Sequence, residues 1–492
     1  MPDRGFPARG GFWGAAAASV LAASLAAGSG ADPWRPAYHF APPFGWMNDP
    51  NGLVQFRGTY HLFYQHHPFG VDWGPMHWGH ATSPDLVGWA HQPIALAPSP
   101  DGPDAGGCFS GSAVDDGGRL SLVYTGHGPA QVQCLARSPD GRVFTKHSAN
   151  PVIAAPPPGF PPADFRDPKV WRARGRWWLV AGTKRDGKGH ALLYESEDLE
   201  RWTFKSVMAA SDGATGAMWE CPDVFALGDR HVLLVSPNEG LDRPRVFAIT
   251  GRLDYETGRF AQESHRLADF GFDFYAPQTF EDSRGRRILI GWMENWARKT
   301  WPTKARGWAG AMTVPRLVGL RPDGVPTWTP VPELQALRRD EVGVAPREVP
   351  PGETALPGIE GDALELLVEL EPGPSGSAGL AVRRSADGRE ETRIVYDSRA
   401  RTLAVDRERA GAGDGGVHAA PLPLGEGEAL RLHVFVDRSS VEVFAQDGRV
   451  VITDRVFPRP DSRGTALFAE GGPARLRSLR AWRLAEARPT GP

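Results

Sequence analysis

The sequence has too few cysteines for a disulfide framework, and it has no cluster of basic residues. Cys108, Cys134 and Cys221 are the three cysteines among 492 residues, and no pair has Cys-x-x-Cys spacing, so zinc-finger and thiol redox motifs have no support. Lysine and arginine number 55 against 58 acidic residues, a formal net charge of −3. Electrostatic binding of nucleic acid needs a clustered basic surface, which disfavours that class of partner.

Long apolar runs are also scarce. The one markedly apolar segment extends from Phe12 to about Ala27, which is shorter than the roughly 20 residues of a membrane span. Arg4 and Arg9 precede it and small residues follow it, so residues 1–31 are predicted to be a signal-like alanine-rich segment of a periplasmic or secreted protein. The alternative is an over-extended start codon, which leaves a disordered tail on a cytoplasmic protein. No membrane partner is expected.

Helical periodicity is almost absent up to about residue 330, and 59 glycines and 46 prolines argue against a helical bundle. Instead a polar phrase with a central aspartate and a closing aromatic recurs. It occupies residues 82–89, 137–144 and 195–202, and more loosely 251–260. The closing aromatics are 55, 58 and 58 residues apart, which indicates an internal repeat.

Each repeat also contains a stretch rich in β-branched and aromatic residues. These stretches are centred near Phe63, Val123, Leu179, Leu234 and Leu289. Five repeats of a few short strands each predict an all-β fold with a five-bladed β-propeller over residues 32–335. We then expect a linker over residues 336–350. Alternating segments such as 363–370 and 432–436 predict an antiparallel β-sandwich over residues 351–487.

Acidic and hydroxyl side chains fall at one position of this repeat. Asp49, Ser110, Asp167, Glu220 and Tyr275 each lie 12 to 14 residues before a strand centre. Equivalent positions of a circular repeat lie around one axis, so these side chains are predicted to converge at the mouth of the channel. Bringing three carboxylic acids together is unfavourable because their negative charges repel one another. A glycosidase nevertheless needs such an arrangement, with a carboxylate nucleophile beside a protonated acid.

Several motifs around these positions resemble those of one family. They are Trp46-Met47-Asn48-Asp49-Pro50-Asn51-Gly52, Phe109-Ser110-Gly111-Ser112, Phe165-Arg166-Asp167-Pro168, Glu220-Cys221-Pro222-Asp223, the 272–278 run and Asp437 to Phe444. In this order they resemble glycoside hydrolase family 32, the invertases and fructan hydrolases. The resemblance extends from about Tyr38 to Leu484.

The resemblance implies a propeller followed by a sandwich, and hydrolysis of terminal β-D-fructofuranosides with retention. It implies Asp49 as nucleophile, Glu220 as acid/base and Asp167 as transition-state stabiliser, with Arg166 beside Asp167 to keep it ionised. It also implies a set of residues that bind a small carbohydrate: Trp46, Asn48, Gln65, Trp73, Phe109, Ser110, Arg166, Tyr275 and Trp296. No cofactor and no metal are expected, since His77 and His80 lie on opposite faces of their predicted strand.

Sucrose is the predicted substrate. The alternatives are an exo-acting hydrolase of levan or inulin and a sucrose-6-phosphate hydrolase, although phosphate handling belongs in the cytoplasm and conflicts with the signal-like segment. A sugar-binding propeller without catalysis is a further alternative. It is disfavoured because all three acids are present, which binding alone does not require.

Overall fold

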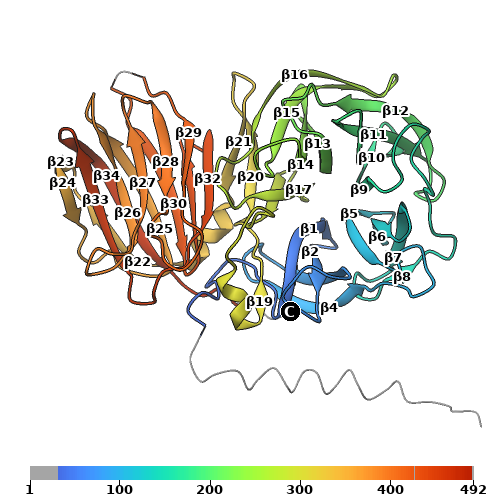
Figure 1. The fold of residues 1–492 in the computed structure, drawn as a ribbon, viewed down its shortest axis with the longest axis horizontal. Coiled ribbons are helices and arrows are strands. Elements are labelled where there is room, and N and C mark those ends of the chain that lie inside the picture. Colours follow the sequence, from blue (N-terminus) through green and yellow to red (C-terminus); the bar gives the residue numbers. More distant parts are fainter. Residues whose placement is uncertain (1–31, 426, 490–492) are drawn as a thin grey trace, which may run out of the picture. The chain divides into compact units, whose positions relative to one another are not determined.

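The computed structural model describes residues 32–425 and 427–489, and the signal-like segment 1–31 lies outside them. The chain divides into Met1–Pro33 and Trp34–Pro492, and the fold below is that of the second unit. Its regular structure is almost entirely β-strand, as predicted (Figure 1). Within the described residues, no helix has the length and apolar character needed to cross a membrane.

Five small sheets account for the chain from residue 45 to residue 330. The first has the order β19 (Trp308–Ala309), β1 (Gly45–Phe56), β2 (Thr59–His67), β3 (His77–Ser83) and β4 (Ala90–Leu96). The second has β5 (Gly107–Asp115), β6 (Leu120–His127), β7 (Gln131–Ser138) and β8 (Thr145–Lys146). The third has β9 (Phe165–Ala173), β10 (Arg176–Arg185), β11 (Lys188–Ser196) and β12 (Thr203–Ala210). The fourth has β13 (Met218–Leu227), β14 (Arg230–Glu239), β15 (Phe247–Asp254) and β16 (Arg259–Leu267). The fifth has β17 (Tyr275–Glu281), β18 (Arg287–Trp292), β20 (Arg316–Leu320) and β21 (Pro326–Pro330).

The first strands of these sheets form a closed cycle. β1 contacts β5, β5 contacts β9, β9 contacts β13, β13 contacts β17, and β17 contacts β1 (Figure 1). We call this arrangement the five-sheet ring. All five predicted strand centres lie in the second strand of a sheet, and all five predicted site positions lie in the first. The repeat therefore places the site side chains around one axis.

The repeated polar phrase forms the turn between the third and fourth strands. Asp85 Oδ1 accepts hydrogen bonds from the backbone amides of Val87 and Gly88, and Asp198 Oδ1 does the same for Glu200 and Arg201. An aspartate that bonds backbone amides further along the chain stabilises a tight turn without regular strand pairing. The looser copy at Asp254 also forms such a turn, through the amide of Glu256.

Each first strand contains one residue more than its partner at the predicted site position. The register with the second strand shifts between Met47 and Pro50, between Phe109 and Gly111, between Arg166 and Lys169, between Glu220 and Asp223, and between Tyr275 and Gln278. Such a β-bulge locally breaks the hydrogen-bond ladder and turns a side chain in a new direction.

The sequence explains the position of these bulges. Pro50, Pro168, Pro222 and Pro277 lie within four of them, and a proline cannot donate a hydrogen bond to the neighbouring strand. In the second sheet the bulge instead ends at Gly111, where a Cβ atom would lie 2.1 Å from the carbonyl oxygen of Val123. The Pro-containing motifs are therefore strand interruptions rather than exposed turns.

Two larger sheets follow the ring and the short 3₁₀ turn η3 (Pro332–Leu337), while another such turn, η2 (Pro302–Arg306), lies within the ring between β18 and β19. One sheet has the order β22 (Arg338–Val344), β34 (Ala474–Leu484), β25 (Leu364–Glu371), β30 (Leu430–Asp437), β31 (Ser440–Ala445) and β32 (Val450–Arg455), with β23 (Arg347–Val349) also on β34. The other has β24 (Gly352–Ala355), β33 (Gly464–Glu470), β26 (Ser377–Arg384), β27 (Thr392–Asp397), β28 (Thr402–Asp406) and β29 (Val417–Pro421).

Residues of both larger sheets share one apolar core, and we call this region the two-sheet layer. The segment 336–350, predicted as a linker, is not one. Most of it forms β22 and β23, whose backbones pair antiparallel with β34. Its exposed, polar composition is that of an edge strand, which sequence alone does not distinguish from a connection.

A buried charged group joins the two-sheet layer to the ring. His39 Nδ1 lies 2.8 Å from Asp437 Oδ2, and His39 Nε2 lies 2.8 Å from Glu442 Oε1, with all three side chains fully buried. Both ring nitrogens must carry hydrogen to make these contacts, so His39 is an imidazolium. Burial lowers the pKa of His39, but its hydrogen bonds to the two carboxylates outweigh that effect and raise the pKa to about 9.

We predict that His39 makes stability decrease with rising pH. The folded-state pKa lies above the usual 6.5, so its contribution is complete below pH 6.5 and is lost as pH rises through about 9. In this window the group lowers the free energy of unfolding by about 1.4 kcal/mol for each pH unit. Urea unfolding of the wild type and of His39→Gln between pH 6 and pH 10 measures it.

The variant should be less stable at pH 6 and should lack this part of the slope, so that the two stability curves converge at high pH. Parallel curves for the two proteins would show that His39 is not charged in the folded state.

Candidate active site

Most of the predicted site residues line a cavity of about 550 Å³. Residues from strands of the first four sheets and from connections between strands form its wall, and the acids and Ser110 at the bulges of β1, β5, β9 and β13 are among them. The lining residues are Asn48, Asp49, Gln65, Trp73, Phe109, Ser110, His127, Gln131, Ala163, Asp164, Arg166, Asp167, Glu220, Asn238, Pro244 and Trp296.

Asp49 is buried with a hydrogen-bond donor on each carboxylate oxygen. Asn48 Nδ2 donates to Oδ1 at 3.0 Å, and Ser110 Oγ donates to Oδ2 at 2.6 Å. Burial raises the pKa of Asp49, the two hydrogen bonds lower it, and the charge of Glu220 raises it again. The donors favour the ionised form and fix the orientation of the carboxylate.

Asp167 lies in the bulge of β9 with a left-handed backbone, φ 63°. Its amide donates to Thr125 Oγ1 at 2.8 Å, and its Oδ2 accepts from the amide of Cys221 at 2.9 Å. Burial raises the pKa of Asp167, the charge of Arg166 lowers it, and the charges of Glu220 and Asp49 raise it.

Cys221 lies between two of the acids. Its Sγ is 3.5 Å from Asp49 Oδ2 and 3.6 Å from Asp167 Oδ2. Burial and the surrounding carboxylates raise the pKa of this thiol well above its ordinary value. Cys221 is therefore a neutral donor that can give its single hydrogen to either carboxylate.

Glu220 differs from the other two acids in its partners. Arg166 donates to Glu220 Oε1 through Nε at 3.1 Å and Nη2 at 2.9 Å. The other oxygen, Oε2, lies 2.5 Å from the hydroxyl of Tyr275, which is also 2.7 Å from the carbonyl oxygen of Ser236.

The hydroxyl of Tyr275 has one hydrogen for these two neighbours. Burial and the charge of Glu220 raise the pKa of Tyr275 well above its ordinary value, so the phenol keeps that hydrogen. A carbonyl oxygen can only accept. When the hydroxyl donates to Ser236, the 2.5 Å contact with Glu220 Oε2 requires a proton on Glu220. When Glu220 is ionised, the same hydroxyl can donate to it instead.

Arg166 does not have the predicted partner. It was expected to hold Asp167, but its guanidinium bonds Glu220, Asp164 and Gln131. Arg166 and Asp167 are adjacent in the interrupted strand β9, but their side chains have different hydrogen-bond partners. Arg166 still lowers the pKa of Asp167 through its charge.

The predicted binding residues lie in two layers. Asn48, Gln65, Trp73, Phe109, Ser110, Arg166 and Trp296 line the cavity, whereas Trp46 and Tyr275 lie behind its wall and are 2% and 1% exposed. Trp46 stacks on Trp296 with ring centroids 5.7 Å apart and donates through Nε1 to Asn48 Oδ1 at 2.8 Å. These two residues therefore support side chains that face the cavity.

Other lining residues were not predicted. His127 ends β6, Gln131 begins β7, Asn238 is near the end of β14, and Asp164 precedes β9. His127 stacks on Phe109 with centroids 4.4 Å apart and planes 12° apart. For His127, Gln131 and Asn238, the sequence signal that could have found them is the turn after a second strand, which lies at the same end of the sheet as the bulge in the first strand.

The lining offers carboxylates, amides and aromatic faces, the groups that proteins use against sugar hydroxyls and sugar rings. Within residues 32–425 and 427–489, no group of three or more His, Cys, Asp or Glu side chains has the arrangement of a metal site.

Comparison with known proteins gives matches over nearly the whole chain. The model of the glycosyl hydrolases family 32 N-terminal domain matches residues 39–326, and that of the family 32 C-terminal domain matches residues 333–483. A sucrose-6-phosphate hydrolase of Escherichia coli is 43% identical, covering 91% of this chain and 94% of the relative. A raffinose invertase of Escherichia coli is 41% identical, covering 92% and 95%. The solved structure of the Bombyx mori β-fructofuranosidase BmSUC1 is 35% identical with a TM-score of 0.80, covering 93% of this chain and 95% of that one.

We predict that the cysteines of the native protein resist alkylation. Cys108, Cys134 and Cys221 are at most 3% exposed, and burial raises the pKa of each thiol. The thiolate is the reactive form, so iodoacetamide at pH 8 should modify none of them in the native protein and all three in guanidinium chloride. Intact-mass spectrometry counts the adducts. Rapid modification of native Cys221 would contradict its position between two carboxylates.

Proposed function

The chain belongs to glycosyl hydrolase family 32, and we propose that it is a retaining β-fructofuranosidase that releases terminal, non-reducing β-D-fructofuranosyl units, with sucrose as its substrate. The family resemblance in its motifs is thereby confirmed, and the protein is a glycoside hydrolase. The observation that carries the proposal is one cavity in which two carboxyl groups have different surroundings. Asp49 has a neutral donor on each oxygen, and Glu220 has the guanidinium of Arg166 on one oxygen and the hydroxyl of Tyr275, which can donate or accept, on the other.

The proposed architecture is that of the family. The five-sheet ring is a five-bladed β-propeller in which each small sheet is a blade, and the two-sheet layer is a β-sandwich. The closed cycle of first strands and the shared core of the two larger sheets support this assignment.

Asp49 acts as the nucleophile in this proposal. Its carboxylate attacks the anomeric carbon of the fructosyl unit and forms a covalent glycosyl-enzyme intermediate, as retaining glycosidases do. Asn48 and Ser110 hold both of its oxygens, which reduces the motion needed to reach the reacting carbon. Cys221 adds a weak donor to the same oxygen as Ser110.

Glu220 acts first as acid and then as base. In the first step it protonates the leaving glycosyl oxygen, and the hydroxyl of Tyr275 turns from Ser236 to the carboxylate that remains. In the second step Glu220 takes a proton from water, which attacks the intermediate, and the Tyr275 hydroxyl turns back. Arg166 stays on Oε1 in both states and keeps the carboxyl group oriented.

Asp167 stabilises the charge that develops on the fructosyl ring. The transition state of glycoside hydrolysis resembles an oxocarbenium ion, and a buried carboxylate accepts hydrogen bonds from sugar hydroxyls most strongly in that state. The amide of Cys221 holds Asp167 Oδ2 in place for this contact.

We predict that Glu220→Gln loses hydrolysis of sucrose but keeps a reactive nucleophile. General acid catalysis contributes about 10²- to 10⁴-fold, so kcat on sucrose should fall by that factor. β-Fructofuranosyl fluoride, whose leaving group needs no protonation, should still form the intermediate. Azide, which needs no general base, should then release β-fructofuranosyl azide, identified by NMR.

The matched control is Asp49→Asn, which should form no β-azide from the fluoride. An α-configured azide from Glu220→Gln, or equal losses on sucrose and on the fluoride, would contradict the assigned roles.

The charge of the cavity favours an unphosphorylated leaving group. Its lining contains the acids Asp49, Asp164, Asp167 and Glu220, against the single guanidinium of Arg166. His127 does not offset this charge, since burial and Arg166 lower its pKa. A nearby cation, Lys184, is bound to Glu239 and lies 3.4 Å from Asp164 Oδ2. A phosphate group entering this cavity meets net negative charge.

We therefore predict at least about tenfold higher kcat/KM on sucrose than on sucrose-6-phosphate, equivalent to about 1.4 kcal/mol of differential binding. Asp164→Asn should raise the relative value for the phosphate ester, because it removes one of the repelling charges. Added salt should raise it too. Side-by-side kinetics with inulin and levan completes the measurement.

A higher kcat/KM on sucrose-6-phosphate would contradict the charge argument. A higher value on inulin or levan would assign the leaving group to a fructan chain instead.

A further inference from the structure

An irregular segment of the ring contributes an aromatic side chain to the wall of the cavity. Residues 293–301, between β18 and η2, form no strand, and their backbone makes few contacts of its own. Trp296, 37% exposed, projects from this segment and lines the cavity. An irregular segment needs side chains from elsewhere to hold it, because it has no hydrogen-bond ladder.

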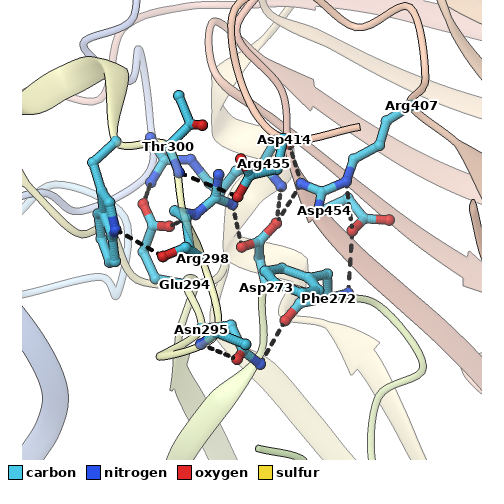
Figure 2. Close-up of polar contacts among 12 residues, drawn as sticks. Phe272, Asp273, Glu294, Asn295, Arg298, Thr300, Arg407, Asp414, Asp454 and Arg455 are labelled. Atoms are coloured by element: carbon cyan, nitrogen blue, oxygen red, sulfur yellow. Dashed lines mark hydrogen bonds and ion pairs between the residues drawn. The ribbon is translucent and has the colours of Figure 1, made fainter. Parts of the chain in front are cut away.

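The two-sheet layer supplies those side chains (Figure 2). Asp414, on the connection between β28 and β29, accepts through Oδ2 from the amide of Lys299 at 2.8 Å and from that of Thr300 at 3.3 Å. Arg455 of β32 donates to Glu294 Oε1 at 2.6 Å. Both ends of the segment are thus held by residues more than a hundred positions further along the chain.

A buried aspartate adds a second tie. Asp273 Oδ2 accepts from the amide of Arg455 at 2.7 Å and from Arg407 Nη1 at 3.0 Å, and Asp273 Oδ1 accepts from Arg298 of the segment (Figure 2). Arg298 Nε also pairs with Glu294 Oε2 at 2.5 Å. The side chains of Asp273, Glu294, Arg298, Arg407 and Arg455 are at most 1% exposed, so none of these charges is compensated by water.

The segment is linked to the proposed nucleophile by successive contacts. Trp296 stacks on Trp46, Trp46 Nε1 donates to Asn48, and Asn48 Nδ2 donates to Asp49. A displacement of the segment therefore acts first on the sugar-facing surface of Trp296, and only then on groups that touch the reacting carbon.

We infer that Asp414, Arg407 and Arg455 of the two-sheet layer are positioning residues for substrate binding, which act by fixing the segment 293–301 and with it Trp296. This inference rests on the proposed function for its substrate. All residues that line the cavity precede residue 300. The two-sheet layer thus affects the affinity for the substrate although none of its residues lines the cavity.

Asp414 offers the cleanest test, because it is only partly buried, whereas removal of one partner from the buried ion pairs would destabilise the protein strongly. Asp414→Ala removes two backbone hydrogen bonds from the segment. It should raise KM for sucrose by about three- to tenfold with kcat changed less than about twofold, as expected when a contact serves ground and transition state alike. Asp414→Asn keeps an acceptor oxygen and should restore KM.

The matched control is Asp397→Ala. Asp397 Oδ1 accepts from the amides of Arg399 and Ala400 at 2.8 and 2.9 Å, at the turn between β27 and β28 of the two-sheet layer. It should leave KM unchanged. In a Trp296→Ala background, Asp414→Ala should have no further effect on KM, because the side chain through which it acts is absent.

Hydrogen exchange provides a readout that does not depend on activity. Amides of residues 294–301 should exchange faster in Asp414→Ala than in the wild type, Asp414→Asn or Asp397→Ala. Unchanged exchange, or a KM effect that persists without Trp296, would overturn the inference. Faster exchange in a protein that hydrolyses no fructoside would overturn the proposed function alone.

Discussion

The interruption of the first strand in every sheet of the ring is the constraint on which the site depends. A regular strand sends alternate side chains to opposite faces of its sheet and gives none of them the direction of the ring axis. The extra residue in each first strand interrupts that alternation at the same level of the ring. Asp49, Ser110 and Asp167 lie in the bulges of their strands, and Glu220 and Tyr275 directly precede the bulges of theirs. Proline at four of the five bulges removes the competing ladder hydrogen bond.

The three acids of the cavity differ because their donors differ. Asp49 has a neutral donor on each oxygen, Asp167 has a backbone amide and a thiol, and Glu220 has a guanidinium on one oxygen and a phenol on the other. Without these donors, burial would favour the protonated forms of Asp49 and Asp167 more strongly. The proposed division of roles thus rests on the groups around the acids, among them Ser236, whose carbonyl competes for the hydrogen of Tyr275.

The sequence repeat predicts where the site residues lie, but not which of them form hydrogen bonds with one another. Five positions that recur every 55 to 58 residues occupy equivalent places around a ring, whatever the details of each strand. The positions of Asp49, Asp167 and Glu220 could therefore be predicted from the sequence. The partner of Arg166 could not, because it depends on the local conformation of an interrupted strand, which residue types alone do not specify. His127 and Asn238 were missed for another reason: they lie at ends of second strands, whose apolar centres dominate the pattern. The residues of the edge strands β22 and β23 are predicted as a linker because exposed edge strands have the amino-acid composition of loops.

The motif from Asp437 to Phe444 contributes no residue to the cavity lining, and its contacts explain why a signature of a hydrolase family extends into the two-sheet layer. Asp437 accepts from the amides of Ala37 and Tyr38 and from His39, while Glu442 accepts from His39, Arg316 and the amide of Val314. These partners come from the segment that leads into the first sheet and from the last sheet. The first and last sheets of the ring meet where the chain leaves β18, pairs β19 in parallel with β1 of the first sheet, and returns to β20 of the last. The hairpin of β30 and β31 binds both sides of this junction with two carboxylates, which holds the ring closed, and in the closed ring residues at the bulges of the first four sheets line one cavity.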